Sequence, residues 1–151
     1  MKRTLLAATL AALSLVAHAV GSMDEPSASE RIANAHKAIA AKDFRRAMFE
    51  LNAAARDEPR NPEVHNLLGY TYRVQPDADL PKSFEHYEIA LKLKPDHKAT
   101  LEYLGEAYLM DKKPAEAEKQ LARLEQVCGN RTCAEYQELF KAIADFKAKG
   151  N

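Results

Sequence analysis

Two stretches of this chain repeat one another and decide its fold: AKDFRRAMFELNAAARDEPRNPEVHNLLGYTY at 41–72 and DADLPKSFEHYEIALKLKPDHKATLEYLGEAY at 77–108. Small, apolar, aromatic and proline positions recur between them at a constant offset of 36 residues. A fixed period of this size is typical of proteins built from stacked repeats. The matched pairs are Ala47 with Ser83, Leu51 with Tyr87, Ala54 with Ala90, Pro59 with Pro95, Leu68 with Leu104, Gly69 with Gly105 and Tyr72 with Tyr108.

The glycines of the repeat indicate closely packed helices. Gly69 and Gly105 lie inside helical patterns, where glycine costs roughly 1 kcal/mol relative to alanine. Close approach of a second helix offsets that cost. We expect the facing residues to be small as well, namely Ser83 or Ala90 opposite Gly69 and Ala117 opposite Gly105.

Prolines and capping residues set the ends of these helices. An interior proline removes a backbone donor and clashes with the preceding turn, so Pro59 and Pro95 end helices. Asn61 before Pro62 is typical of a helix start. A third, more degraded copy runs from Gly105 through the small and apolar residues up to about residue 128. We therefore predict antiparallel helix pairs at 28–41 with 44–57, 62–75 with 80–94, and 98–111 with 114–128.

The small, large, small, proline order of these positions resembles the tetratricopeptide repeat, across residues 28 to about 130. The middle copy has two extra residues in the turn VQPDADLP, which lengthens the period. His65 and Leu101 stand where the family often has tryptophan, and Gly129 replaces the third proline. The resemblance implies an all-α fold, a short right-handed solenoid of three helix pairs that needs a capping helix at its end.

The end of the chain supplies that cap. Apolar residues from Tyr136 to Phe146 recur at helical spacing, and Thr132 with Glu135 forms a capping-box pattern before them. We expect a cap at about 132–149, closing a solenoid that spans 29–149.

Cys128 and Cys133, the only cysteines, flank the turn before this cap. In an exported protein an even number of cysteines favours a disulfide, which would pin the cap to the last repeat. Redox-active pairs usually have two intervening residues, and this pair has four. A redox or soft-metal role for the two thiols, with histidines nearby, stays open as the alternative.

The first residues indicate export. Met1-Lys2-Arg3, an apolar run and Ala17-His18-Ala19 are typical of a secretory signal peptide, cleaved after Ala19. Residues 20–28 are expected to form a disordered leader. We therefore expect a periplasmic protein without a membrane anchor. Without residues 1–19 it has 22 − 2 = 20 basic and 22 acidic residues, a net charge near −2, which gives no basic footprint for nucleic acid.

Nothing in the sequence pairs a nucleophile with a base, and no glycine-rich phosphate loop is present. The histidines fall on different helices or turns, without the three-to-five spacing that places two metal ligands on one face. His65 lies on an apolar face and is expected to be a satisfied core residue. The sequence predicts a non-enzyme that has neither cofactor nor metal.

The family resemblance implies where a partner would bind. In tetratricopeptide proteins the first helices of successive repeats line a concave groove that holds peptides or helices. The mixed aromatic, apolar and acidic lining predicts a partner of basic or mixed apolar character and disfavours capture of a C-terminal carboxylate. The residues assigned to partner binding are Ile32, His36, Asn66, Tyr70, Arg73, Glu102, Glu106 and Leu109, with Ser29, Ile39, Glu63 and Met110 beside them.

The leading functional hypothesis is an exported protein–protein interaction module, a monomer or weak oligomer, that assists assembly or regulation of an envelope complex. The alternative is a periplasmic redox or soft-metal sensor or carrier that uses Cys128, Cys133 and the histidines. A purely structural spacer is a third class.

Overall fold

The structure, a computed structural model, describes residues 25–150. The expected signal peptide and residues 20–24 of the expected leader lie outside this range. The described residues form seven α-helices and no strand, which confirms the all-α prediction. The helices are α1 (Ala28–Ala40), α2 (Phe44–Asp57), α3 (Pro62–Val74), α4 (Leu80–Leu93), α5 (Lys98–Met110), α6 (Pro114–Cys128) and α7 (Ala134–Ala148).

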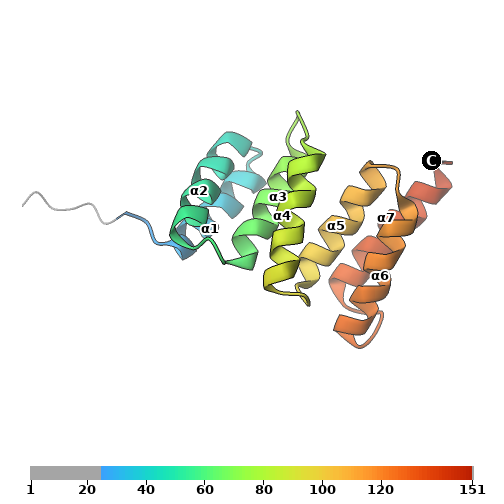
Figure 1. The fold of residues 1–151 in the computed structure, drawn as a ribbon. Helices are drawn as coiled ribbons and strands as arrows, with labels where there is room; N and C mark the ends of the chain where they lie inside the picture. Colours follow the sequence, from blue (N-terminus) through green and yellow to red (C-terminus); the bar gives the residue numbers. More distant parts are fainter. Residues whose placement is uncertain (1–24, 151) are drawn as a thin grey trace, which may run out of the picture.

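The helices stack as three antiparallel pairs in a row, with α7 against the last pair (Figure 1). Within each pair the two helices pack on each other, and α2 contacts α3 as α4 contacts α5. The last helix contacts both α5 and α6. The predicted short solenoid of three helix pairs with a capping helix is therefore confirmed. Within residues 25–150 no helix combines the length and the apolar character that a membrane span requires.

Polar side chains start most of these helices where the sequence predicts them. Asn61 accepts hydrogen bonds from the backbone N–H groups of Glu63 and Val64, with Pro62 as the first helical residue. Asp43 and Asp79 cap α2 and α4 in the same way. Such caps satisfy donors that have no partner inside the helix.

The starts of the first and last helices, α1 and α7, differ from the predicted ones. Ser27 forms a capping box with Glu30, so α1 starts within the last two residues of the range assigned to the leader. The capping box predicted for α7 is wrong, because Cys133 is the N-cap residue and gives no side-chain hydrogen bond. The Thr132 N–H instead donates to the Asn130 side chain, which stabilises the turn rather than the helix.

Gly69 allows α3 and α4 to approach closely, as predicted, but the nearest side chain is that of the large Tyr87 rather than one of the small residues expected there. A Cβ atom added at Gly69 would lie 2.6 Å from the ring of Tyr87 and 3.1 Å from the backbone oxygen of Ser83. The Ser83 hydroxyl donates a 2.8 Å hydrogen bond to the Gly69 carbonyl. The small residues at these two positions therefore form a direct polar and steric contact between paired helices.

Gly105 faces a different neighbour from the one predicted. The three atoms nearest to an added Cβ all belong to Leu139 of α7, the closest at 2.5 Å, and not to Ala117. The third repeat has Leu121 where the second has the larger Tyr87, and this leaves space over Gly105. The capping helix fills that space, so Gly105 couples the cap to the solenoid.

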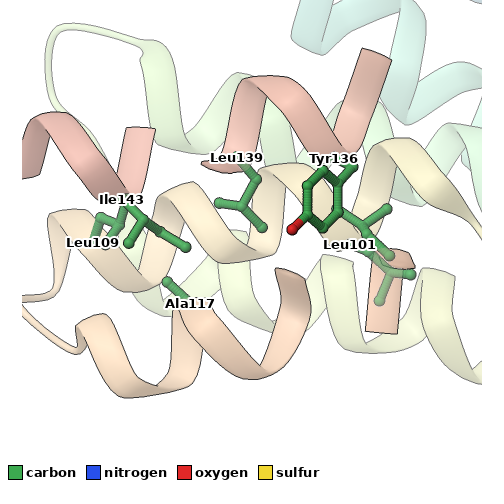
Figure 2. Packing of buried hydrophobic residues seen from close by; sticks show 7 residues of the cluster. Leu101, Leu109, Ala117, Tyr136, Leu139 and Ile143 are labelled. Atoms are coloured by element: carbon green, nitrogen blue, oxygen red, sulfur yellow. The ribbon is translucent and has the colours of Figure 1, made fainter. Parts of the chain in front are cut away.

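The largest buried cluster joins α5, α6 and α7 (Figure 2). Leu139 and Leu124 are fully buried in it, and Phe146 packs at its edge. Phe140, which the sequence pattern places in the same apolar stripe, is 53% exposed. The cap thus buries a narrower stripe than predicted. The fully or largely buried members of this cluster are Leu101, Leu109, Ala117, Leu124, Tyr136, Leu139 and Ile143.

Candidate interaction face

The side chains of α1, α3 and α5 meet across successive repeats, and we call this surface the odd-helix face. Its first part is a row of polar contacts around Glu63. One carboxylate oxygen of Glu63 lies 3.2 Å from Nε2 of His97, and the other lies 3.6 Å from Nε2 of His36. The Thr100 hydroxyl donates a 3.0 Å hydrogen bond to the Asn66 side chain. These contacts tie the three repeats together along one face.

The second part is an aromatic and acidic cluster on α3 and α5, made of Tyr70, Arg73, Glu102, Tyr103 and Glu106. The rings of Tyr70 and Tyr103 lie 4.8 Å apart, centroid to centroid, and are tilted by 49°. The Arg73 guanidinium carbon lies 5.3 Å from the Tyr70 ring and 5.7 Å from the Tyr103 ring. Its Nη2 lies 2.6 Å from Glu106 Oε2. We call these five residues the tyrosine–glutamate cluster.

Arg73 is the buried member of this cluster and holds the two rings in place. Its side chain is 9% exposed, and its Nε donates a 3.4 Å hydrogen bond to the hydroxyl of the fully buried Tyr87 on α4. A guanidinium that already contacts two rings, a carboxylate and a phenol has little surface left for a partner. Arg73 lies on this face and its contacts are within the protein, so the binding role assigned to it from the sequence stays a prediction.

Other residues assigned to partner binding are also turned into the protein. Asn66 is 1% exposed and Leu109 is 8% exposed, while Ile32 packs against the core of the first repeat. At these positions the register of the helix points the side chain at a neighbouring helix. Those that retain surface on the odd-helix face are His36, Tyr70, Glu102 and Glu106, with Ser29, Glu63 and Met110.

Tyr103 is the residue of this face that sequence reasoning missed. It follows Glu102 directly and is partly exposed, with its ring against Tyr70. The residue 36 positions earlier is Leu67, which is not aromatic, so the comparison of repeats did not mark Tyr103. The available signal is that Tyr103 lies one helical turn before Glu106, which the sequence analysis assigns to this face.

Glu102 is a partly buried carboxyl of the odd-helix face whose surroundings disfavour its charged form. Partial burial raises the pKa of its carboxyl to about 8, with further contributions from the negative charges of Glu106 and then of Glu135 and Glu138 on α7. Arg73 lowers the same pKa but is bound to Glu106. Within residues 25–150, Glu102 forms no ion pair. The carboxyl is therefore largely protonated near neutral pH.

A shallow pocket of about 450 Å³ continues this surface toward the C-terminal ends of α5 and α7. Met110, which is 48% exposed, lies between the two regions, because Nη1 of Arg73 approaches its sulfur at 4.0 Å. The pocket is mostly apolar, with charged residues at its rim. It is lined by Leu109, Met110, Lys112, Ala142, Asp145, Phe146 and Lys149.

His65 is a satisfied core residue, as the sequence predicts. It is 8% exposed, and its Nε2 donates to the backbone oxygen of Pro59 at 3.0 Å. Its Nδ1 then accepts from Nδ1 of His86 at 3.1 Å. Burial, followed by the charge of His65, lowers the pKa of His86. This pair lies between α3 and α4 and leaves the odd-helix face to His36 and His97.

The structure joins Cys128 and Cys133 in a disulfide, with Cα atoms 6.2 Å apart. Cys128 ends α6, Gly129 adopts a left-handed conformation at φ 69°, and Cys133 is the N-cap residue of α7. The carboxylate of Glu135 lies within 4.8 Å of both sulfurs. No histidine of residues 25–150 joins this group, so the histidines that the alternative hypothesis invokes lie elsewhere.

Comparisons with known proteins bear on the fold. The type III secretion translocator chaperone SycD of Yersinia enterocolitica, solved as an alternative dimer, superposes with a TM-score of 0.68 at 15% sequence identity. The alignment covers 82% of this chain and 94% of the SycD chain. The shared feature is the helical-repeat fold. No protein-family model matches this chain, and no curated protein matches it.

Proposed function

We propose that this protein is an exported member of the tetratricopeptide repeat family that binds a peptide or helix of a partner protein on the odd-helix face. In this role it assists assembly or regulation of an envelope complex. The observation that carries the proposal is the tyrosine–glutamate cluster, in which two partly exposed tyrosines and an uncompensated carboxyl lie side by side on adjacent repeats.

The composition of the face supports a binding role. Tyrosine is enriched at the energetic centres of protein interfaces, because it offers a large contact area and a polar tip. The contacts of Arg73 fix both rings before any partner arrives, which reduces the entropy lost on binding. Export is proposed from the signal-peptide pattern of residues 1–19. SycD, which shares the fold, is named a chaperone.

Affinity capture from envelope extract tests this proposal. The bait is the purified chain, and the test variant is Tyr70→Ala/Tyr103→Ala, which removes the two rings but retains Arg73. The matched control is Phe49→Ala, since Phe49 is a 62% exposed aromatic on α2, outside the odd-helix face. We expect the double variant to lose the specific partner and the control to keep it. Loss with Phe49→Ala and retention with the double variant would overturn the proposal.

The redox or soft-metal sensor remains a second candidate because Glu135 lies near both sulfurs. Sulfur in a disulfide is a poor metal ligand, since the thiolate is the form that binds metal. The sensor therefore requires a reduced state with two free thiols. Thiol titration and metal analysis of protein purified without reductant separate the two functions: no free thiol and no bound metal eliminate the sensor in its simple form.

A further inference from the structure

We propose that the partner presents a lysine or arginine beside an apolar residue, and that this cation docks on the tyrosine–glutamate cluster between the Tyr103 ring and the Glu102 carboxylate. The proposal rests on the proposed function and names the chemistry of its partner. It concerns Tyr70, Tyr103 and Glu102, because Arg73 and Glu106 are already paired with each other in an ion pair.

The charges around Glu102 favour a cation. Glu106 on the same helix and Glu135 and Glu138 on α7 all act on the Glu102 carboxyl, and the cation that opposes them is Arg73. Arg73 is paired with Glu106 at 2.6 Å. Among the residues that the structure describes, neither Glu102 nor the two carboxylates of α7 forms an ion pair. The surface thus has an excess of negative charge that a basic side chain of a partner would balance.

The two tyrosines make the same position suitable for a cation. Aromatic faces attract ammonium and guanidinium groups within about 6 Å of the ring centroid. Arg73 already uses this attraction from the buried side of both rings. Tyr70 and Tyr103 are both partly exposed, so the rings retain surface for a second cation. Their packing gives the docking position a fixed geometry.

The neighbouring pocket specifies an apolar residue beside the cation. The exposed thioether of Met110 leads from the cluster to the apolar hollow bounded by Phe146. Methionine adapts its shape to different apolar side chains. A partner segment that carries a basic residue followed by an apolar one would occupy both places, whereas an acidic segment or a free C-terminal carboxylate would be repelled by the negative charges of Glu135 and Glu138.

Binding of such a partner should release a proton. The raised pKa of Glu102, about 8, means that its carboxyl is largely protonated at neutral pH. A cation placed beside it favours the ionised form and lowers that pKa. Proton release on binding is therefore a signature of a basic group at Glu102, which an apolar or acidic partner would not produce.

Selection from a random peptide library tests the proposal. Peptides displayed on phage are selected on the immobilised purified chain and, in parallel, on Glu102→Gln and on the control Glu88→Gln, an exposed carboxylate of α4. We expect wild type and Glu88→Gln to enrich lysine or arginine next to an apolar residue, and Glu102→Gln to lose that enrichment. Affinity of the best peptide should fall by about tenfold in Glu102→Gln.

Calorimetry of that peptide in two buffers with different ionisation enthalpies then measures proton release, which we expect for wild type and not for Glu102→Gln. Enrichment of acidic or uncharged peptides that still require Tyr70 and Tyr103 would overturn this proposal and leave the proposed function intact. Basic enrichment that persists in Glu102→Gln would also overturn it. If no selected peptide loses affinity in Tyr70→Ala/Tyr103→Ala, the proposed function fails as well.

Discussion

Arg73 Nη2 on α3 lies 2.6 Å from Glu106 Oε2 on α5, and this ion pair joins the second repeat to the third. The arginine side chain is 9% exposed and the glutamate side chain 28%. Burying the guanidinium is compensated by the carboxylate, by two tyrosine rings and by the Tyr87 hydroxyl. The pair therefore positions the rings that a partner would contact.

Replacing Arg73 should destabilise the fold. In Arg73→Met a partly buried Glu106 loses its cation, and breaking one side of a buried pair costs about 3 kcal/mol or more. Urea unfolding followed by circular dichroism measures the loss. Lys147→Met, which breaks the exposed pair with Glu118, is the control and should cost less than about 1 kcal/mol. Equal losses in the two variants would contradict the architectural role of Arg73.

Gly69→Ala should also destabilise, although alanine is the better helix former. The added methyl group would lie 2.6 Å from the ring of Tyr87, which is fully buried and cannot move aside. Overpacking of this kind lowers the free energy of unfolding by about 1–3 kcal/mol. The better helix propensity of alanine raises it by roughly 1 kcal/mol, so we expect a net loss. Denaturant unfolding measures the net change. A more stable Gly69→Ala protein would show that α3 and α4 are not tightly packed there.

The order of the helices could be predicted because capping residues and prolines in the sequence mark where helices start and end. Pro62, Asn61 and Asp79 set caps that the structure retains. The burial of side chains on the odd-helix face was harder to predict. A helical wheel gives the direction of a side chain, but it does not show whether a side chain of the next repeat covers it. Asn66 points along the expected face, yet Thr100 from the next repeat covers it.

The contact between the capping helix and Gly105 could not be predicted from the repeat pattern either. Gly105 was assigned to Ala117 by analogy with the second repeat, but Leu139 lies against it. The difference depends on the size of one residue, Leu121 in place of a tyrosine, and on a helix outside the repeat pattern. The contacts between the repeats and the capping helix depend on the sizes of individual side chains, which the repeat period does not reveal.

Loss of the disulfide should weaken the attachment of the cap. The bond between Cys128 and Cys133 closes a short loop, and the chain-entropy model gives about 2 kcal/mol for a loop of this length. We expect Cys128→Ser/Cys133→Ser to unfold at lower urea concentration by that amount while keeping its helical spectrum. Unchanged stability would indicate that the packing of Leu139 on Gly105 alone holds α7.

The histidine pair between α3 and α4 should make stability depend on pH below neutrality. The pKa of His86 is lowered in the folded protein, so the unfolded chain binds the proton more readily. The free energy of unfolding should therefore be highest above the ordinary histidine pKa of about 6.5 and fall as the pH drops below it. His86→Asn, which keeps a donor toward His65, should flatten this part of the profile. An identical slope in the variant would assign the effect to other groups.

Glu102 should give the opposite dependence. Its pKa is raised to about 8 in the folded protein, so the folded state holds a proton that the unfolded chain releases at lower pH. Stability is then lost as the pH rises from the ordinary carboxyl pKa toward about 8. Glu102→Gln should be more stable than wild type above that range and similar to it in acid. A less stable Glu102→Gln at high pH would show that Glu102 has a cation partner.

Nuclear magnetic resonance can show whether the odd-helix face of α3 and α5 binds a partner through Tyr70 and Tyr103. The measurement is of intermolecular contacts between a peptide selected on the chain and the aromatic rings of the protein, with Phe49 on α2 as the internal reference. We expect nuclear Overhauser effects from a lysine or arginine side chain of the peptide to the ring of Tyr103, and none to Phe49. Contacts confined to Phe49, with Tyr70 and Tyr103 unperturbed, would contradict it.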